Sequence, residues 1–296
     1  MKGIILGGGI AGLLVAEKLN YPIIESNPRV GGTFSQEIND ITLQMPCVVG
    51  KECANYLSQY DIPSVEIDIL PMYRKIEHFQ EKVGFNLLRL EEVEWLSKFT
   101  SKKLYIVYLK DFVNKLTRNK RIIKSRLSMI KDNVVRLSNG MTFDTPEIVN
   151  ASSRKALASI LALDLGKLGS ILAAVFAIAT KKENVDWNLM LNGARGDLFS
   201  IVLRDNRGKE YDLYFVYSFF NSALSFPSNF RDRIYSNLKR RRVLLREKVI
   251  ADRLLIFNEG IVFGELPMDD FIHVGRLGLW KNFDICSTIK SVDVVG

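Results

Sequence analysis

The sequence predicts an α/β protein (α+β overall), with one domain built on a parallel sheet and a smaller domain built on a mostly antiparallel sheet. Three observations lead to this prediction. A strand pattern, a glycine-rich turn and a helix pattern open the chain, and a strand, turn and helix pattern also closes it. Between them, residues 156–255 are rich in β-branched and aromatic residues separated by turns. With 296 residues, 47% of them hydrophobic, the chain can bury two lobes.

The first element is a short apolar run at residues 4–6, typical of a central strand in a parallel sheet. The six residues that follow match G-x-G-x-x-G and are Gly7, Gly8, Gly9, Ile10, Ala11 and Gly12. Gly7 permits a tight turn, Gly9 lets the backbone approach a pyrophosphate, and Gly12 lets the next helix pack closely on the strand. The N-terminus of that helix offers free N–H groups and a partial positive charge.

The second strand, "YPIIE", ends at Glu25, 18 residues after Gly7. A carboxylate at this distance can accept hydrogen bonds from both hydroxyls of an adenosine ribose. It would repel a 2′-phosphate, which argues against NADP. Strand, turn, helix and acid together predict a Rossmann-like dinucleotide-binding domain.

The residues after Glu25 distinguish FAD from NAD. "ESNPRVGGTF" (25–34) resembles the E-x-x-x-R-x-G-G-x segment of the superfamily of FAD-containing amine oxidases, protoporphyrinogen oxidases and UDP-galactopyranose mutases. The resemblance implies that FAD is the cofactor, that Arg29 offers a cation to its phosphates, and that Gly31 and Gly32 let the chain pass close to the flavin. It also places Ser26 and Thr33 among the cofactor-binding residues.

The far end of the chain carries a second resemblance to the same superfamily. "HVGRLGLWKNFDICSTIKSV" (273–292) is similar to its closing signature and fits it at Gly275, Arg276, Gly278, Trp280 and Asp284. Asp284 is expected to cap a helix that starts near Ile285. The free N–H groups of that helix would then face the flavin and stabilise negative charge on it.

Two intermediate segments complete the expected site. Residues 121–152 are predicted to form a strand, a hairpin with Asn139-Gly140 at its turn, and a buried strand. The resemblance assigns adenine binding to the backbone at Leu127. It also brings residues 42–50, "TLQMPCVVG", toward the flavin, so the expected flavin-facing or substrate-binding residues are Gln44, Met45, Pro46, Cys47 and Trp280. Cys47 is either a buried small hydrophobe or a thiol in redox contact with the flavin.

Because the two strong motifs lie at opposite ends, the FAD-binding domain is expected to be discontinuous. We assign it residues 1–60, 105–155 and 256–296, with a helical insertion at 61–104. The substrate domain is expected to span 156–255, with a sheet followed by a basic helix at 229–248. Its aromatic residues form either a substrate cage or ordinary core, and are Trp187, Tyr214, Tyr217, Phe219 and Phe220.

Three functions are compatible with these motifs. The first is an FAD-dependent oxidoreductase, amine oxidase-like or protoporphyrinogen oxidase-like, acting on an unidentified substrate. The second is a non-redox flavoenzyme, a mutase or isomerase that uses reduced FAD. However, residues 42–50 lack the histidine-rich stretch of the mutases. The third is a flavin-binding subunit without turnover of its own. The sequence identifies no catalytic residues, since FAD supplies the reactive atom.

Composition bounds the partners. A net charge of +8 favours acidic partners in general. The basic run at 239–248 is either a solvated helix face or a patch for an anionic substrate, a nucleic acid or a membrane surface. No nucleic-acid-binding motif accompanies it, so the expected partner is a small molecule, either hydrophobic or anionic. Oligomeric state is not predicted.

Membrane insertion, metal binding and disulfides are not expected. Asp164 and Lys167 interrupt the apolar stretch at 156–180, which is read as a buried helix followed by a core strand, although peripheral membrane contact stays open. With two histidines, a histidine-rich metal site is not expected. Three cysteines at unrelated spacings predict no disulfide framework and therefore a reducing, cytoplasmic location.

Overall fold

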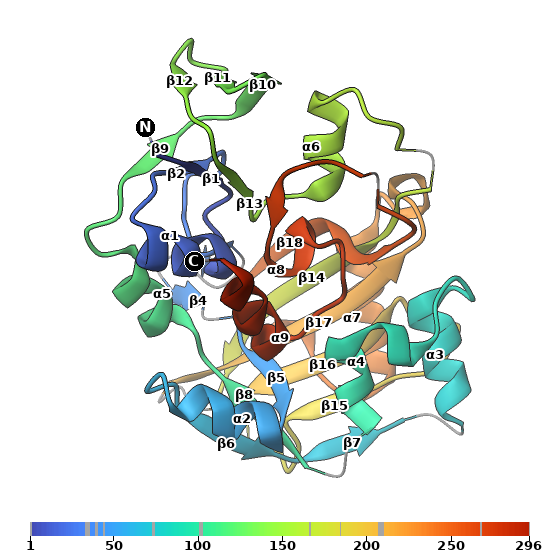
Figure 1. Cartoon of the computed structure of the whole chain (residues 1–296). Helices are drawn as coiled ribbons and strands as arrows, with labels where there is room; N and C mark the ends of the chain where they lie inside the picture. Colours follow the sequence, from blue (N-terminus) through green and yellow to red (C-terminus); the bar gives the residue numbers. More distant parts are fainter. Residues whose placement is uncertain are drawn as a thin grey trace.

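The computed structural model describes residues 2–32, 36–38, 41–43, 45–72, 75–100, 103–165, 167–183, 185–206, 210–266 and 268–295. A parallel sheet with its helices lies on one side of the molecule, and a long-stranded antiparallel sheet lies on the other (Figure 1). The mixed α/β architecture that the sequence predicts is confirmed.

The parallel sheet has the order β19-β13-β1-β2-β9. Its strands are β1 (Ile4–Leu6), β2 (Ile23–Glu25), β9 (Ile122–Lys124), β13 (Ile148–Asn150) and β19 (Ile272–His273). Three separate parts of the chain therefore build one sheet, and Ile4 pairs with Ile148 while Ile5 pairs with Ile23. Both faces of β1 are buried, which explains its continuous apolar sequence.

Different elements cover the two faces of this sheet. One face packs on helices α1 (Ile10–Leu19), α5 (Lys110–Thr117) and α9 (Ile285–Lys290). The other packs on α6 (Arg154–Ile160) and on a small antiparallel sheet of β10 (Leu127–Lys131), β11 (Val134–Leu137) and β12 (Thr142–Asp144). The predicted hairpin turn at Gly140 is present, with φ +86°.

The second large sheet has the order β18-β14-β17-β16-β15-β7. Its strands are β7 (Ile69–Pro71), β14 (Gly169–Lys181), β15 (Leu189–Leu191), β16 (Phe199–Asp205), β17 (Tyr211–Phe220) and β18 (Val249–Phe263). Alternate residues of β17 face opposite ways. Leu213 and Phe215 join a core that the second sheet shares with residues 67–108, whereas Tyr214 and Val216 pack beneath helix α7 (Phe230–Arg240).

The remaining elements pack against one or the other of the two large sheets. A three-stranded sheet contains β5 (Cys47–Gly50), β6 (Ser64–Ile67) and β8 (Leu104–Val107), and β3 (Gln36–Ile38) pairs with β4 (Ile41–Leu43). The accompanying helices are α2 (Lys51–Ser58), α3 (Ile76–Gly84), α4 (Glu94–Ser97) and the single turn α8 (Gly275–Gly278). Segment 61–104, expected to be helical, also contains the strands β6 and β7. Strand β7 extends the second sheet by pairing with β15. The domain boundaries themselves stay a prediction.

Helix α7 is shorter than predicted. The expected helix at 229–248 ends at Arg240, and Arg242 adopts a left-handed conformation with φ +57°. Val243 N–H then donates to Leu238 O at 2.9 Å and Arg242 N–H to Lys239 O at 3.0 Å, the pattern of a Schellman ending. This turn buries Val243 and Leu244, so the apolar residues after 240 do not continue the helical face.

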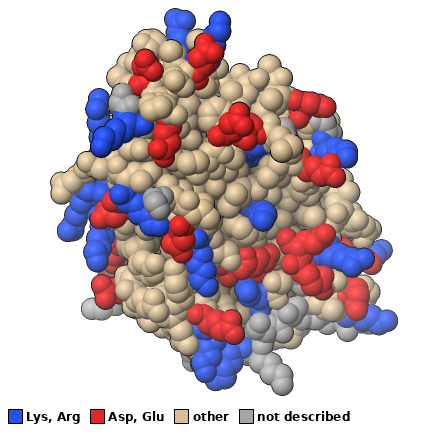
Figure 2. All heavy atoms as spheres, viewed as in Figure 1, with Lys and Arg blue, Asp and Glu red and all other residues tan. Residues whose placement is uncertain are grey.

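Most of the basic run meets acidic partners. Arg240 and Arg241 both bind the buried Asp197 carboxylate, while Arg246 pairs with Asp232 and Lys248 with Glu183. On the face of the molecule shown in Figure 2, basic and acidic side chains are likewise interspersed. The run is therefore integrated into the fold through ion pairs.

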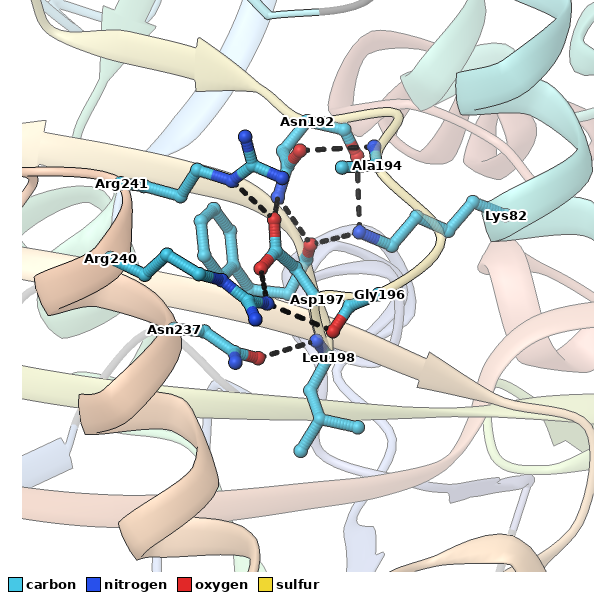
Figure 3. A network of polar contacts seen from close by, with 10 residues as sticks. Lys82, Asn192, Ala194, Gly196, Asp197, Leu198, Asn237, Arg240 and Arg241 are labelled. Carbon is cyan, nitrogen blue, oxygen red and sulfur yellow. Dashed lines mark hydrogen bonds and ion pairs between the residues drawn. The ribbon is translucent and has the colours of Figure 1, made fainter.

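Asp197 lies in the loop between β15 and β16 and binds the end of α7, while Lys82 of α3 contacts the same loop (Figure 3). Burial by itself would raise the pKa of Asp197, but hydrogen bonds from Arg240, Asn192 and Arg241 hold it below its usual range. Across the loop, Lys82 donates to the carbonyl oxygens of Asn192 and Phe199, and burial lowers the pKa of Lys82 to about 7. These contacts hold the loop in place at the end of the second sheet.

A disulfide corrects the cysteine prediction. Cys53 in α2 and Cys286 in α9 are bonded although 233 residues separate them. Both helices pack in the core of the parallel-sheet domain, which brings the two cysteines together in a way that sequence spacing does not reveal. The bond removes the argument for a reducing compartment. Within the described residues, no helix is both long and apolar enough to cross a bilayer.

Candidate functional site

A cavity of about 350 Å³ lies between the two large sheets. Three regions that the sequence singled out line it: the glycine-rich N-terminal region up to Gly32, the segment that leads into β5, and the closing segment. The inner face of the second sheet closes it. The predicted residues among its lining are Gly9, Ile10, Ala11, Gly31, Gly32, Met45, Pro46, Cys47, Gly275, Arg276, Asp284 and Ile285. Its size falls within the usual range of ligand pockets.

The first contributor is the glycine turn between β1 and α1. Gly7 has φ +97°, a conformation that favours glycine. A Cβ at Gly12 would lie 2.0 Å from the Gly7 carbonyl oxygen, so the helix can approach the turn only without a side chain there. This close packing places the N-terminus of α1 at the cavity.

Gly9 and Gly32 line the cavity for a different reason. A Cβ at either residue would have no protein atom within 4 Å. At Gly31, by contrast, a Cβ would lie 2.4 Å from Val113 Cγ1. Packing within the protein explains Gly31, whereas the space beside Gly9 and Gly32 is open to a ligand. The open spaces beside Gly9 and Gly32 therefore fit a bound dinucleotide that lies against the backbone.

Glu25 lies buried at the end of β2, next to the turn. Its Oε2 accepts the Gly8 N–H at 2.7 Å and its Oε1 accepts the Asn27 N–H at 2.6 Å. Each carboxylate oxygen can accept a second hydrogen bond, so both retain capacity for ribose hydroxyls. A Cβ at Gly8 would lie 2.6 Å from Val30 Cγ1. Gly8, a variable position in the motif, is thus a positioning residue that motif reading missed.

The segment leading into β5 supplies the second contributor. Met45, Pro46 and Cys47 line the cavity, and Gln44 lies outside the described residues. Burial raises the pKa of the Cys47 thiol, and the negative charge of Asp284 raises it further. Cys47 is therefore a neutral thiol at physiological pH, which is the less nucleophilic form.

The closing segment supplies the third contributor. Asp284 caps α9, with its side chain accepting the Ser287 N–H at 2.9 Å, which confirms the predicted cap. Arg276 donates to the carbonyl oxygens of Glu259 at 2.6 Å and Gly260 at 3.2 Å. Burial lowers the pKa of Arg276 to about 10, so it stays positively charged at neutral pH. Arg276 thus attaches α8 to β18 at the cavity wall.

Several predicted residues lie elsewhere. Ser26 and Arg29 are exposed and are not among the described residues that line the cavity. Leu127 begins β10, and Trp280 lies in a small core cluster where its indole N–H donates to Phe263 O at 2.9 Å. Thr33 lies outside the described residues. The cofactor roles of all the predicted residues stay predictions.

The sequence reading missed the residues with which the second sheet lines the cavity. Ala173 and Val175 on β14 face it, together with Ile201, Tyr217 and Phe257 from neighbouring strands. A signal was present in the alternation of Ala173, Val175, Ala177 and Ala179, which share one core while the residues between them join another. Small residues at every second position leave room above that face.

The described residues contain one cluster of metal-ligand side chains, formed by Cys53, Asp284 and Cys286. Its two sulfur atoms are bonded to each other, so they are not thiolate ligands in this state. The cavity lacks a convincing nucleophile and base pair among its described residues. The cavity does combine the N-terminus of α1, the open space beside Gly9 and Gly32, and the apolar face of the second sheet. This arrangement is suited to holding a dinucleotide cofactor against a second molecule.

No protein-family model matches the chain, and no curated protein matches its sequence. Solved structures do match it along its length. An oxidoreductase from Methanosarcina mazei has a TM-score of 0.69 and 14% identity, over 100% of this chain and 99% of that one. Reduced UDP-galactopyranose mutase has a TM-score of 0.71 and 11% identity, over 99% and 92%. Putrescine oxidase bound to putrescine has a TM-score of 0.63 and 10% identity, over 86% and 84%.

At these identities the likeness establishes the fold alone. The matches extend over both large sheets and include two oxidoreductases and a mutase. The chain therefore shares the fold of these proteins, a Rossmann-type parallel-sheet domain beside a mostly antiparallel sheet domain.

Proposed function

We propose that this chain is an FAD-dependent oxidoreductase that acts on a small molecule bound beneath the second sheet. One observation carries the proposal: a single cavity joins the N-terminus of α1, the Gly31-Gly32 pair, the Cys47 segment and the Asp284 segment to the inner face of that sheet. A cofactor and a substrate would meet there.

In this proposal different residues of the chain bind different parts of FAD. The α1 N-terminus and Gly9 receive the pyrophosphate, and Glu25 accepts ribose hydroxyls. The open backbone at Gly32 and the capped start of α9 lie along the flavin. When bound, FAD supplies a hydride acceptor.

The second sheet has a different role in the proposal. Its apolar side chains exclude water and position the substrate against the cofactor. Two of the matched structures, the Methanosarcina mazei oxidoreductase and putrescine oxidase, are oxidoreductases by name, which supports this reaction class at a coarse level.

A non-redox flavoenzyme that needs reduced FAD is the second candidate. The TM-score of 0.71 to reduced UDP-galactopyranose mutase favours it. Among the described residues that line the cavity, Arg276 is the one positively charged side chain. It already donates hydrogen bonds to the carbonyl oxygens of Glu259 and Gly260. A sugar diphosphate would need more cations than that, which favours the oxidoreductase.

The decisive experiment begins with the cofactor. The protein is saturated with FAD and desalted, and the nucleotide released on denaturation is identified by its spectrum and chromatographic mobility. Non-covalent FAD at one equivalent is expected, whereas retention of NAD alone, or of no nucleotide, would refute the proposal. Bleaching of the flavin band by a substrate would then identify an oxidoreductase, while activity that appears only after dithionite reduction would identify the second candidate. FAD binding without either response would indicate a flavin-binding subunit.

A further inference from the structure

The sheet-side half of the cavity, here called the chamber, is formed mainly by carbon. Its walls include Trp95, Phe99, Val175, Ile201, Leu203 and Phe257. Among the described residues that line the whole cavity, the charged side chains are Arg276 and Asp284, and both lie in the closing segment rather than in the chamber. The chamber walls themselves carry no charge in the described part of the chain.

The two charged groups nearby are already engaged. Asp284 accepts the Ser287 N–H and lies 4.0 Å from Lys98 Nζ. Arg276 donates to two carbonyl oxygens of β18. A ligand that brought an ammonium or a carboxylate into the chamber would lose its hydration without gaining an ion-pair partner, which is costly in an apolar site.

Tyr217 gives the chamber a polar group, its phenolic hydroxyl. It lines the cavity from β17, and within the described residues its hydroxyl has no hydrogen-bonding partner. Burial raises the pKa of Tyr217, and the neighbouring Cys47 raises it further, so the hydroxyl keeps its proton and can donate it in a hydrogen bond. A hydroxyl in such surroundings gains free energy when a ligand offers it an acceptor.

We propose that the chamber binds an uncharged, mainly apolar, ring-containing molecule, and that the Tyr217 hydroxyl donates a hydrogen bond to an acceptor atom on that molecule. This inference rests on the proposed function for the identity of the ligand as substrate, but the binding preference itself follows from the chamber walls. It excludes a protonated amine and a sugar phosphate as the ligand.

Four probes of similar size test the preference. Acetophenone is neutral and has an acceptor, ethylbenzene is neutral without one, benzoate is an anion and benzylammonium is a cation. Calorimetric titration into FAD-loaded protein is expected to rank acetophenone first, with benzoate and benzylammonium at least tenfold weaker. Equal or tighter binding of either ion, or no binding of acetophenone up to its solubility, would overturn the proposal.

Tyr217→Phe tests the hydrogen bond. It should weaken acetophenone binding about fivefold, the effect of one neutral hydrogen bond, and leave ethylbenzene within twofold. Tyr214→Phe is the matched control, because Tyr214 lies on the same strand but packs on the α7 side. It should leave both affinities unchanged. An unchanged acetophenone affinity in Tyr217→Phe would refute the role of Tyr217.

The same titrations are run on flavin-free protein, so that the two proposals can fail separately. If the protein holds FAD but the neutral probe does not bind, the chamber assignment fails and the proposed function stands. If the protein does not hold FAD but acetophenone binds through Tyr217, the proposed function fails and the chamber assignment stands.

Discussion

Gly9→Val separates cofactor binding from folding. Gly9 precedes α1 as its N-cap, with φ −70° and ψ 179°, an extended conformation open to any residue. A Cβ there would have no protein atom within 4 Å. Replacing glycine reduces the entropy of the unfolded chain by about 0.4–1 kcal/mol, and the weaker N-cap preference of valine offsets part of this gain. We therefore expect the free energy of unfolding to change by less than about 1 kcal/mol.

The effect on FAD should be much larger. The valine methyl groups would fill the open space in front of the α1 N-terminus, where the pyrophosphate lies in the proposed site. Displacing the phosphates from two backbone N–H groups loses two charge-assisted hydrogen bonds of about 1.5–3 kcal/mol each. At about 1.4 kcal/mol per factor of ten, FAD should bind at least 100-fold more weakly.

Flavin fluorescence titration and thermal unfolding by circular dichroism measure the two effects on the same samples. Gly50→Val is the matched control, because Gly50 caps α2 with φ −76° and ψ 168° and is outside the cavity lining. It should retain both FAD and fold. Gly12→Val should lose both, since its Cβ would lie 2.0 Å from Gly7 O. Wild-type FAD affinity in Gly9→Val would refute the site assignment.

Three further predictions follow from single contacts. Asp284→Ala should destabilise the start of α9 by about 0.5–2 kcal/mol and weaken FAD retention, because it removes the N-cap hydrogen bond. Asp284→Asn should preserve the cap. Equal loss of FAD in both variants would show that the charge of Asp284, rather than its capping, matters. The Cys53–Cys286 bond predicts that denatured protein exposes one thiol to a thiol reagent before reduction and three after it. Reduction should lower the free energy of unfolding by about 2–5 kcal/mol, because the bond closes a loop of 233 residues. Three reactive thiols without reduction would disprove the bond. Burial and the nearby Arg154 lower the pKa of His273 to about 4, so the stability contributed by its neutral form is complete above about pH 6.5 and is lost as pH falls through 4. In urea titrations, wild-type protein should lose about 3 kcal/mol more than His273→Gln over this interval, and an equal loss in both would contradict the assignment.

The sequence alone was sufficient for the elements that depend on local chemistry. The turn at Gly7–Gly12 follows from backbone conformation and close packing over six residues, and the Asp284 cap depends on a hydrogen bond three residues away. Each of these patterns is complete within a short segment, so it could be read before any tertiary contact was known.

Tertiary structure decided the features that depend on distant segments. The disulfide joins residues 233 positions apart, and α7 ends at Arg240 because burial of Val243 and Leu244 outweighs continuation of its apolar pattern. Only the assembled sheets reveal that Tyr217 faces the cavity while Tyr214, three residues earlier, packs on the opposite side. The physical reason is that strand alternation states which residues share a face, whereas the partner that covers each face is chosen by contacts made across the whole chain.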